Sequence, residues 1–207
     1  MQAEVGIGQL ADELAASGRR RLVGFAGAPG AGKSTVADDL IDALRDRGVV
    51  AVTVPMDGFH LADESLRRLG RLDRKGALDT FDGYGYVALL RRLRGETDHT
   101  VFAPGFDREL EQPLAAAIGV DPEASVVITE GNYLLVDAEP WRQVPRLLDE
   151  VIFVRLDDDL RRQRLIARHV QFGKTAEQAR AWVEQVDEPN ARLIAATAVR
   201  AARLLVR

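Results

Sequence analysis

The chain has 207 residues, no cysteine, and 28 Lys and Arg residues against 32 Asp and Glu residues, which gives a formal net charge of −4. The absence of cysteine excludes disulfides, a thiolate nucleophile and cysteine-based metal sites, and the acidic balance disfavours nucleic-acid binding. No apolar run reaches the ~18 residues of a membrane span, and the N-terminal segment lacks the apolar stretch of a signal peptide. We therefore expect a soluble cytoplasmic protein with one domain over residues 1–207, with neither nucleic acid nor a membrane as partner. The oligomeric state stays open, and a homodimer is one alternative.

Short apolar runs alternate with amphipathic segments along the chain. The patterns predict, in chain order, a helix at 2–17, a strand at 21–26, a helix at 33–47, a strand at 49–54, a short helix at 62–69, a loop at 70–83, a helix at 84–94, a hairpin at 99–120, a strand at 125–129, a helix at 138–148, a strand at 151–156, helices at 157–169, 175–187 and 188–198, and a strand at 204–206. The strand segments are continuously apolar, which is typical of parallel strands that are buried on both faces. The alternation predicts an α/β fold, a parallel sheet with helices on both sides.

A glycine-rich segment follows the first predicted strand and matches the pattern G-x-x-x-x-G-K-[ST]. It consists of Gly27, Ala28, Pro29, Gly30, Ala31, Gly32, Lys33 and Ser34, with Thr35 next in the chain. Glycines let such a loop curl until several backbone N–H groups point at a phosphate, and the helix that follows adds its dipole. In this pattern the lysine reaches the β- and γ-phosphates and the serine hydroxyl can bind Mg²⁺. The segment predicts an ATP-binding phosphate loop (a Walker A motif).

A phosphate loop alone does not define a function, because switches, motors and kinases share it. The chain lacks the Asn/Thr-Lys-x-Asp guanine reader of a GTPase and the second Gly/Ser-rich signature of a transporter ATPase. A kinase that phosphorylates hydroxyl groups needs a carboxylate base, a carboxylate on the Mg²⁺ side and mobile arginines. The remaining motifs therefore have to decide between these classes.

Two carboxylates follow predicted strands, at the edge of the sheet where α/β proteins bind ligands. Asp57 comes directly after the strand at 49–54 and is the candidate base for the acceptor hydroxyl; capping of the turn after Pro55 is the alternative. Glu130 ends the strand at 125–129 and is the candidate ligand on the Mg²⁺ side. A solvated acid at a strand end is the alternative for Glu130.

Arginines gather on the predicted helix at 157–169. Arg161, Arg164 and Arg168 follow the spacing i, i+3, i+7 and should share one helix face. Such a face can close over ATP as a lid, here about 157–187, and stabilise charge on the transferred phosphoryl group. A solvated basic face is the alternative.

Several residues outside these motifs are candidates for binding the acceptor. A structural role is the alternative for His60, core packing for Tyr133, and a salt-bridged hairpin tip for the segment around Asp107. The candidates are His60, Lys75, Asp82, Phe106, Asp107 and Tyr133.

Taken together, six segments resemble the P-loop kinases of the pantothenate kinase, uridine kinase and phosphoribulokinase group. The resemblance covers about residues 20–200. Within the group, the chain most resembles short bacterial kinases associated with fructose transport. MDGFH and TEGNYLL are much more specific to this group than the phosphate loop. The segments are GAPGAGKST, MDGFH, RKGALDTFDGYG, PGFDRELEQP, TEGNYLL and RRQRLIARH.

The resemblance implies a P-loop NTPase three-layer sandwich, with a five-stranded parallel sheet flanked by helices and an arginine-bearing lid. It implies transfer of the ATP γ-phosphoryl group, with Mg²⁺, to a hydroxyl of a small metabolite such as fructose. Asp57 would be the base or substrate anchor, Glu130 the Walker B acid, and Asn190 would lie near the adenine. Phe106 replaces a tyrosine of uridine-kinase-like relatives, which speaks against a nucleoside acceptor. Pantothenate or nucleoside kinase activity, and an NTP-hydrolysing regulatory switch, remain the alternatives.

The lysines themselves carry a prediction. Only three of the 28 basic residues are lysine, and Lys33, Lys75 and Lys174 all fall in the segments predicted to form the site. A compact ammonium suits a phosphate loop better than a planar guanidinium does. We therefore expect that replacing Lys75 or Lys174 by arginine lowers activity.

Overall fold

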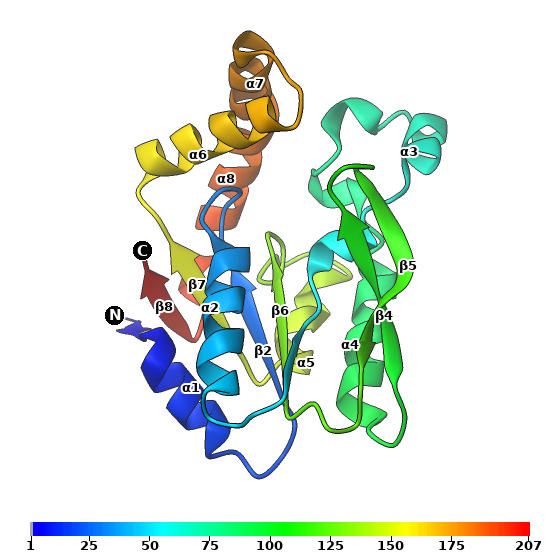
Figure 1. Ribbon diagram of the computed structural model, residues 1–207. Coiled ribbons are helices and arrows are strands. Elements are labelled where there is room, and N and C mark those ends of the chain that lie inside the picture. The colour runs from blue at the N-terminus through cyan, green and yellow to red at the C-terminus, as the bar shows by residue number, and fades with distance from the viewer. Residues whose placement is uncertain (1) are drawn as a thin grey trace.

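Six strands form a parallel sheet in the computed structural model, which describes residues 2–207 (Figure 1). Their order across the sheet is β1-β8-β7-β2-β6-β3, and all neighbouring pairs are parallel. The predicted α/β fold is confirmed, with one strand more than the five expected. The strands are β1 Ala3–Glu4, β2 Arg21–Ala26, β3 Ala51–Thr53, β6 Val126–Gly131, β7 Glu150–Arg155 and β8 Arg203–Val206.

The additional strand, β1, corrects the helix expected at 2–17. Ala3 and Glu4 pair with Arg203 and Leu204 of β8, and the helix begins only at Ile7. The outer side of β8 presents unpaired backbone groups, and an extended N-terminal segment can satisfy them where a helix cannot. The N-terminal strand therefore exists because of the last strand in the chain.

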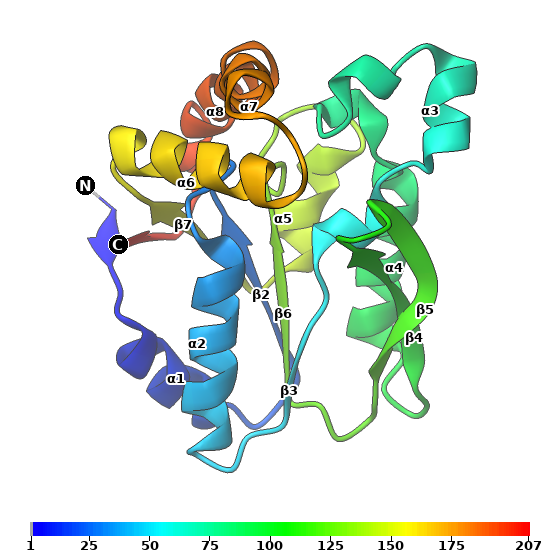
Figure 2. The ribbon, with the colours of Figure 1, turned by 45° about the horizontal axis from the view of Figure 1, so that its top comes forward.

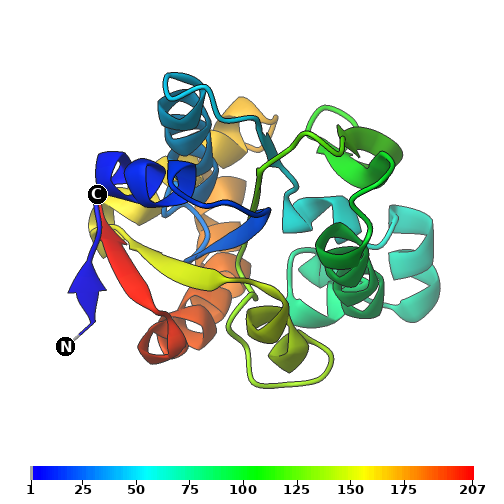
Figure 3. The ribbon, with the colours of Figure 1, turned by 90° about the horizontal axis from the view of Figure 1, so that it is seen from below.

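Helices cover both faces of the sheet, so the molecule has three layers, as the view from below shows (Figure 3). Helices α1 and α2 lie on one face, and α4, α5 and α8 lie on the other. Successive side chains of a strand point to opposite faces, so Leu22 of β2 packs on the α4 side while Val23 and Phe25 pack on the α2 side. The bounds are α1 Ile7–Ala15, α2 Lys33–Arg45, α4 Gly83–Gly95, α5 Val144–Leu147 and α8 Glu188–Ala195.

A second group of elements stands beside the sheet (right in Figure 1). It comprises α3 (Asp63–Leu69) and the antiparallel hairpin of β4 (Val101–Asp107) and β5 (Gln112–Val120). The hairpin expected at 99–120 is confirmed, and the loop expected at 70–83 contains two short 3₁₀ turns. The helix expected at 138–148 is interrupted, because a 3₁₀ turn at Trp141–Gln143 precedes the short α5.

The lid lies above the carboxyl ends of the strands (Figure 2). It consists of α6 (Asp158–Gln171) and α7 (Ala176–Trp182), and a π-helical turn at Val183–Asp187 joins α7 to α8. Thr175 begins α7 with a capping box, in which its side chain accepts from the Gln178 N–H and the Gln178 side chain accepts from the Thr175 N–H. The single α-helix expected at 175–187 was therefore wrong in its second half. Across residues 2–207, every helix is too short or too polar to cross a membrane.

Candidate active site

The phosphate loop connects β2 to α2 at the carboxyl edge of the sheet. Gly30 and Gly32 adopt φ values of 78° and 88°, a left-handed conformation that side chains disfavour. Lys33 is the first residue of α2, so the N-terminus of this helix opens onto the loop. Free backbone N–H groups and the helix dipole both favour an anion at this point. Thr35 is exposed beside the loop, in a second hollow that Arg164, Arg168 and Arg207 also line.

The Lys33 side chain is buried and points into the cavity at this edge. Only 8% of the residue is exposed, and Nζ donates hydrogen bonds to Asn132 Oδ1 (2.8 Å) and to the Ala28 carbonyl (3.2 Å). Burial lowers the pKa of the ammonium, while the carboxylates of Glu130 and Asp57 act in the opposite direction. A lysine ammonium at this point, beside acids that favour its charged form, is suited to binding phosphate.

Ser34 and Glu130 form the part of the site that fits a divalent cation. Ser34 Oγ donates to Glu130 Oε1 over 3.1 Å, and Glu130 is buried. Burial and the nearby Asp57 carboxylate raise the pKa of Glu130, so the environment resists its negative charge unless a cation is added. Within residues 2–207, no cluster of three or more His, Asp or Glu side chains could hold a metal by itself. One hydroxyl and one or two carboxylates suit Mg²⁺, which takes its other ligands from phosphates and water.

Asp57 lies in a 3₁₀ turn (Met56–Phe59) just beyond β3. Its half-buried carboxylate pairs with Arg108 Nη2 of the hairpin at 3.5 Å, and its carbonyl accepts hydrogen bonds from the His60 N–H (3.1 Å) and from Nδ1 (2.8 Å). The carboxylate is therefore directed toward the cavity and the hairpin, which is the position the base hypothesis requires.

Gly58 allows the hairpin to reach Asp57. A Cβ atom at this position would lie 2.3 Å from the carbonyl oxygen of Pro104 in β4, far inside the contact distance. The backbone after β3 and the backbone of β4 therefore touch directly. This contact brings Phe106 and Arg108 to the same cavity as Asp57.

Aromatic rings and a lysine form the half of the cavity away from the phosphate loop. The His60 ring packs against Phe81 and against Phe106, with centroid distances of 4.0 and 4.8 Å. Lys75 Nζ donates to Asp63 Oδ1 over 2.6 Å and to the Glu111 carbonyl, so it joins the loop after α3 to the hairpin tip. Asp63 was not predicted as a site residue, because an acid in the first turn of a helix is usually structural.

Three expected acceptor residues lie outside the cavity, and the structure corrects these predictions. Asp82 is exposed and caps α4 by accepting from the Gly85 N–H over 2.8 Å. Asp107 Oδ1 accepts from the amides of Glu109 and Leu110 and fixes the hairpin turn. The ring of Tyr133 is buried, and its hydroxyl donates to the Gly76 carbonyl over 2.6 Å.

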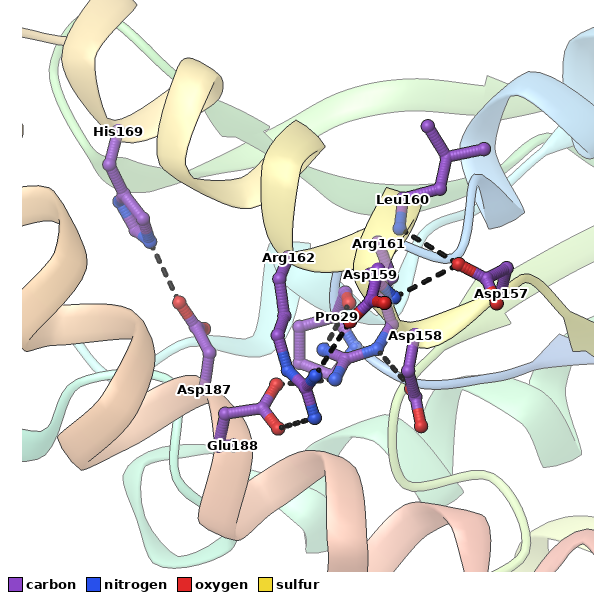
Figure 4. A network of polar contacts seen from close by, with 10 residues as sticks. All are labelled: Pro29, Asp157, Asp158, Asp159, Leu160, Arg161, Arg162, His169, Asp187 and Glu188. Atoms are coloured by element: carbon purple, nitrogen blue, oxygen red, sulfur yellow. Dashed lines mark hydrogen bonds and ion pairs between the residues drawn. The ribbon is translucent and has the colours of Figure 1, made fainter.

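The lid arginines lie on one continuous helix, α6, as the prediction of a shared face requires, but their surroundings divide them into two kinds. Arg161 is buried, with 2% of its side chain exposed, and binds Asp158 (3.0 Å), Glu188 and the Pro29 carbonyl (Figure 4). These contacts connect α6 with α8 and with the phosphate loop, so the role of Arg161 is structural. Arg164 and Arg168 are exposed and line the hollow beside the loop, where they can reach a nucleotide. Arg207 lines the same hollow and was missed, since nothing in the sequence marks it.

The far side of the lid also faces the main cavity. His169 Nε2 lies 2.8 Å from Asp187 Oδ2 (Figure 4), and Lys174 Nζ lies 4.8 Å from the centre of the Trp182 ring. Asn190 of α8 lines this cavity with them. All three lysines of the chain therefore border one cavity of about 320 Å³.

Comparison with known proteins agrees with this geometry. The profile described as "Phosphoribulokinase / Uridine kinase family" matches residues 22–202. A protein of Silicibacter sp. TM1040, described as a candidate fructose transport system kinase, has a solved structure with a TM-score of 0.84 and 37% identity, covering 98% of this chain and 99% of that one. A candidate uridine kinase of Schizosaccharomyces pombe is 34% identical over 84% of this chain and 77% of its own length.

Saccharomyces cerevisiae YFH7 shares the fold, with a TM-score of 0.83 at 20% identity over 98% of this chain and 99% of that one. The match to the family profile covers nearly the whole chain, including the phosphate loop, both edge carboxylates and the lid. The resemblance inferred from the six sequence segments is thereby confirmed. The chain belongs to the phosphoribulokinase / uridine kinase family, and it is an ATP- and Mg²⁺-dependent P-loop kinase that phosphorylates a hydroxyl group of a small molecule.

Proposed function

We propose that the acceptor is a neutral polyhydroxylated molecule, a sugar such as fructose. The observation that carries this proposal is the local charge balance in the half of the cavity away from the phosphate loop. Lys75 is paired with Asp63 at 2.6 Å, and Arg108 is paired with Asp57 at 3.5 Å. These are the cations that the segment after α3 and the hairpin contribute to the cavity, and both already have a carboxylate partner, which disfavours an anionic acceptor at this side, whereas hydroxyl groups can share hydrogen bonds with charged pairs.

The aromatic rings of this region support the same proposal. The His60 ring packs on both Phe81 and Phe106, and all three line the cavity. The C–H faces of a sugar can pack on such rings while its hydroxyl groups reach the polar atoms around them. The name of the Silicibacter relative is consistent with a sugar acceptor.

In the proposed reaction Asp57 accepts the proton of the attacking hydroxyl. The carboxylate lies between the phosphate-loop side, with Lys33 and Glu130, and the hairpin side, with Arg108. Arg108 holds the carboxylate in place, and Lys33 compensates charge on the β- and γ-phosphates. Ser34 and Glu130 would hold Mg²⁺, which supplies further charge compensation on the phosphates when it is bound. Arg164 and Arg168 approach from the lid, and Asn190 and Thr35 lie on the nucleotide side.

A nucleoside is the second candidate, because the Schizosaccharomyces pombe relative carries a uridine kinase description. Phe106 speaks against it, since this position offers a ring without a hydroxyl next to His60. An NTP-hydrolysing switch is the candidate from another class. It would turn over ATP in response to a protein partner and would need no acceptor.

Release of ADP across a panel of acceptors tests the proposal. The panel holds D-fructose and other hexoses, uridine, pantothenate and D-glycerate, each with ATP and Mg²⁺, and Lys33→Ala serves as the inactive control. We expect slow ADP release until a neutral sugar is added. Preference for pantothenate or D-glycerate would overturn the charge argument, and preference for uridine would favour the second candidate.

A further inference from the structure

The side-chain amide of Asn132 is oriented by Lys33. Asn132 directly follows β6, whose carboxyl end carries Glu130, and its Oδ1 accepts a hydrogen bond from Lys33 Nζ over 2.8 Å. An ammonium can only donate, so the amide oxygen must face Lys33, and Nδ2 with its N–H groups must face another part of the site. This contact therefore fixes the direction in which the amide can donate.

The N–H groups of Asn132 Nδ2 are available to a ligand. Among residues 2–207, the bond from Lys33 is the only hydrogen bond of this side chain, and Nδ2 is not one of the fully buried atoms without a partner. Asn132 lines the same cavity as Lys33, Asp57 and Glu130. A ligand oxygen in this cavity can therefore accept a hydrogen bond from Nδ2.

The chain on both sides of Asn132 is held in place. A Cβ atom on Gly131 would lie 2.6 Å from Cβ of Met56, so this glycine lets the end of β6 pack directly on the turn that follows β3. Tyr133 is buried, and its hydroxyl donates to the Gly76 carbonyl over 2.6 Å. A donor between two such fixed residues needs little reorganisation when negative charge develops near it, which is the condition under which a hydrogen bond lowers a reaction barrier.

The strand order places Asn132 between the phosphate loop and Asp57. β6 lies between β2 and β3 in the sheet, and the three strands are parallel (Figure 2). Their carboxyl ends therefore present, in this order, the phosphate loop after β2, Asn132 after β6 and Asp57 in the turn after β3. The γ-phosphoryl group is the end of ATP that leaves the loop toward the acceptor, and its oxygens carry charge that needs stabilisation during transfer. A donor in this middle position is placed to meet those oxygens.

We propose that Asn132 is a further active-site residue that binds the transferred γ-phosphoryl group: Oδ1 orients the Lys33 ammonium, and Nδ2 donates a hydrogen bond to a γ-phosphoryl oxygen. During transfer the acceptor oxygen bonds to the γ-phosphorus while the bond to the departing ADP oxygen breaks, and the hydroxyl proton passes to the base. The amide keeps its own protons and stabilises charge on the phosphoryl oxygens. This role is the same for any acceptor.

Binding of two nucleotides tests this role without an acceptor. Isothermal titration gives the Kd of ADP and of the non-hydrolysable β,γ-imido analogue of ATP, each with Mg²⁺, for the wild type and for variants of Asn132. In Asn132→Ala the donor is lost, and the Kd of the analogue should rise about tenfold or more, the size of one hydrogen bond to a charged group, while the Kd of ADP changes much less. Asn132→Asp keeps an oxygen for Lys33 but puts negative charge in place of Nδ2, so it should bind the analogue more weakly still.

The ratio of the two dissociation constants is the decisive quantity. Asn190 of α8 also lines the cavity, and Asn190→Ala is the control that should leave this ratio at its wild-type value, whatever happens to each affinity. An unchanged ratio in Asn132→Ala, with or without weaker binding of both nucleotides, would assign Asn132 a structural role beside Lys33 and overturn the proposal. Since no acceptor enters the measurement, this outcome is independent of whether the wild type phosphorylates D-fructose.

Discussion

Ser34, in the first turn of α2, donates a hydrogen bond from Oγ to Oε1 of Glu130, near the end of β6, over 3.1 Å. Residues almost a hundred positions apart come together because β2 and β6 are neighbours in register, with Phe25 opposite Glu130 and Ala26 opposite Gly131. The sheet therefore places the Walker acid beside the helix that follows the phosphate loop.

Replacing the buried Glu130 by glutamine should stabilise the free protein while it lowers activity. Burial and Asp57 raise the pKa of this carboxyl, so the folded protein favours its protonated form. Protonated Glu130 therefore contributes to the free energy of unfolding, and this contribution is fully present only below the unfolded pKa of about 4.5. The contribution is lost as the pH rises through the folded pKa. The melting temperatures of the wild type and of Glu130→Gln should therefore differ more as the pH rises, with the higher melting temperature for the variant. Mg²⁺ with ATP should stabilise the wild type more than the variant, and the reverse order would contradict the Mg²⁺ assignment.

Asp57→Asn should lower kcat by about 10² or more, the usual size of general-base catalysis, while ATP still binds. The carboxylate faces Arg108 and the cavity, so an amide of the same shape should leave the fold unchanged. ATP affinity is measured by titration with a non-hydrolysable analogue. Loss of ATP affinity with kcat preserved would exclude Asp57 as the base.

Arg161→Leu should destabilise the protein by about 3–5 kcal/mol, because Glu188 would be left half-buried without its main partner. The neighbouring Arg162 also contacts Glu188, but its side chain is 45% exposed, and Arg162→Leu should cost less than about 1 kcal/mol. Urea unfolding compares the two. Adding Glu188→Leu to Arg161→Leu should recover part of the loss, since the orphaned charge is then removed. Similar losses of unfolding free energy for the two single variants would show that Arg161 does not hold the lid against α8 and the phosphate loop.

Gly58→Ala should separate the hairpin from the turn that carries Asp57. The new methyl group would need the space of the Pro104 carbonyl, 2.3 Å away, and overpacking of this kind costs about 1–3 kcal/mol. We expect a higher KM for the acceptor with little change in the KM for ATP. Gly95→Ala near the end of α4 is the control, because its Cβ would meet nothing within 4 Å. An unchanged acceptor KM in Gly58→Ala would mean that the hairpin does not shape the acceptor site.

Lys75→Arg should lower kcat/KM for the acceptor, since a planar guanidinium cannot bind Asp63, the Glu111 carbonyl and a ligand with the geometry of an ammonium. The reverse exchange one residue earlier, Arg74→Lys, is the matched control. Arg74 is exposed and pairs with Asp79 outside the cavity, so its replacement should leave the kinetics unchanged. Unchanged kinetics in Lys75→Arg as well would show that this position does not require a lysine.

The parts of the fold that depend on local patterns were predictable from the sequence. The apolar run at 21–26, the glycine pattern at 27–34 and the hairpin at 99–120 each contain their own signal, and the structure confirms all three elements. The edge strand β1 depends on pairing with β8, two hundred residues away, and the helical pattern that begins nearby hid it.

The site divides in the same way. Lys33, Ser34, Asp57 and Glu130 lie at or beyond the carboxyl ends of strands, so their shared location could be predicted from the topology. The burial of Arg161 could not, because helical spacing tells which residues share a face and not what lies against it. Asp82 and Asp107 resemble functional acids in the sequence, but each binds amides two or three residues further along. Both carboxylates therefore stabilise local turns and do not reach the cavity.

The most direct measurement follows the γ-phosphoryl group itself. The wild type and Asp57→Asn are incubated with Mg²⁺, γ-³²P-labelled ATP and D-fructose, and the labelled products are separated. We predict that label appears in a sugar phosphate with the wild type and falls by about 10² with Asp57→Asn. Label that appears only as inorganic phosphate with the wild type, at a rate independent of D-fructose, would contradict transfer to a sugar hydroxyl.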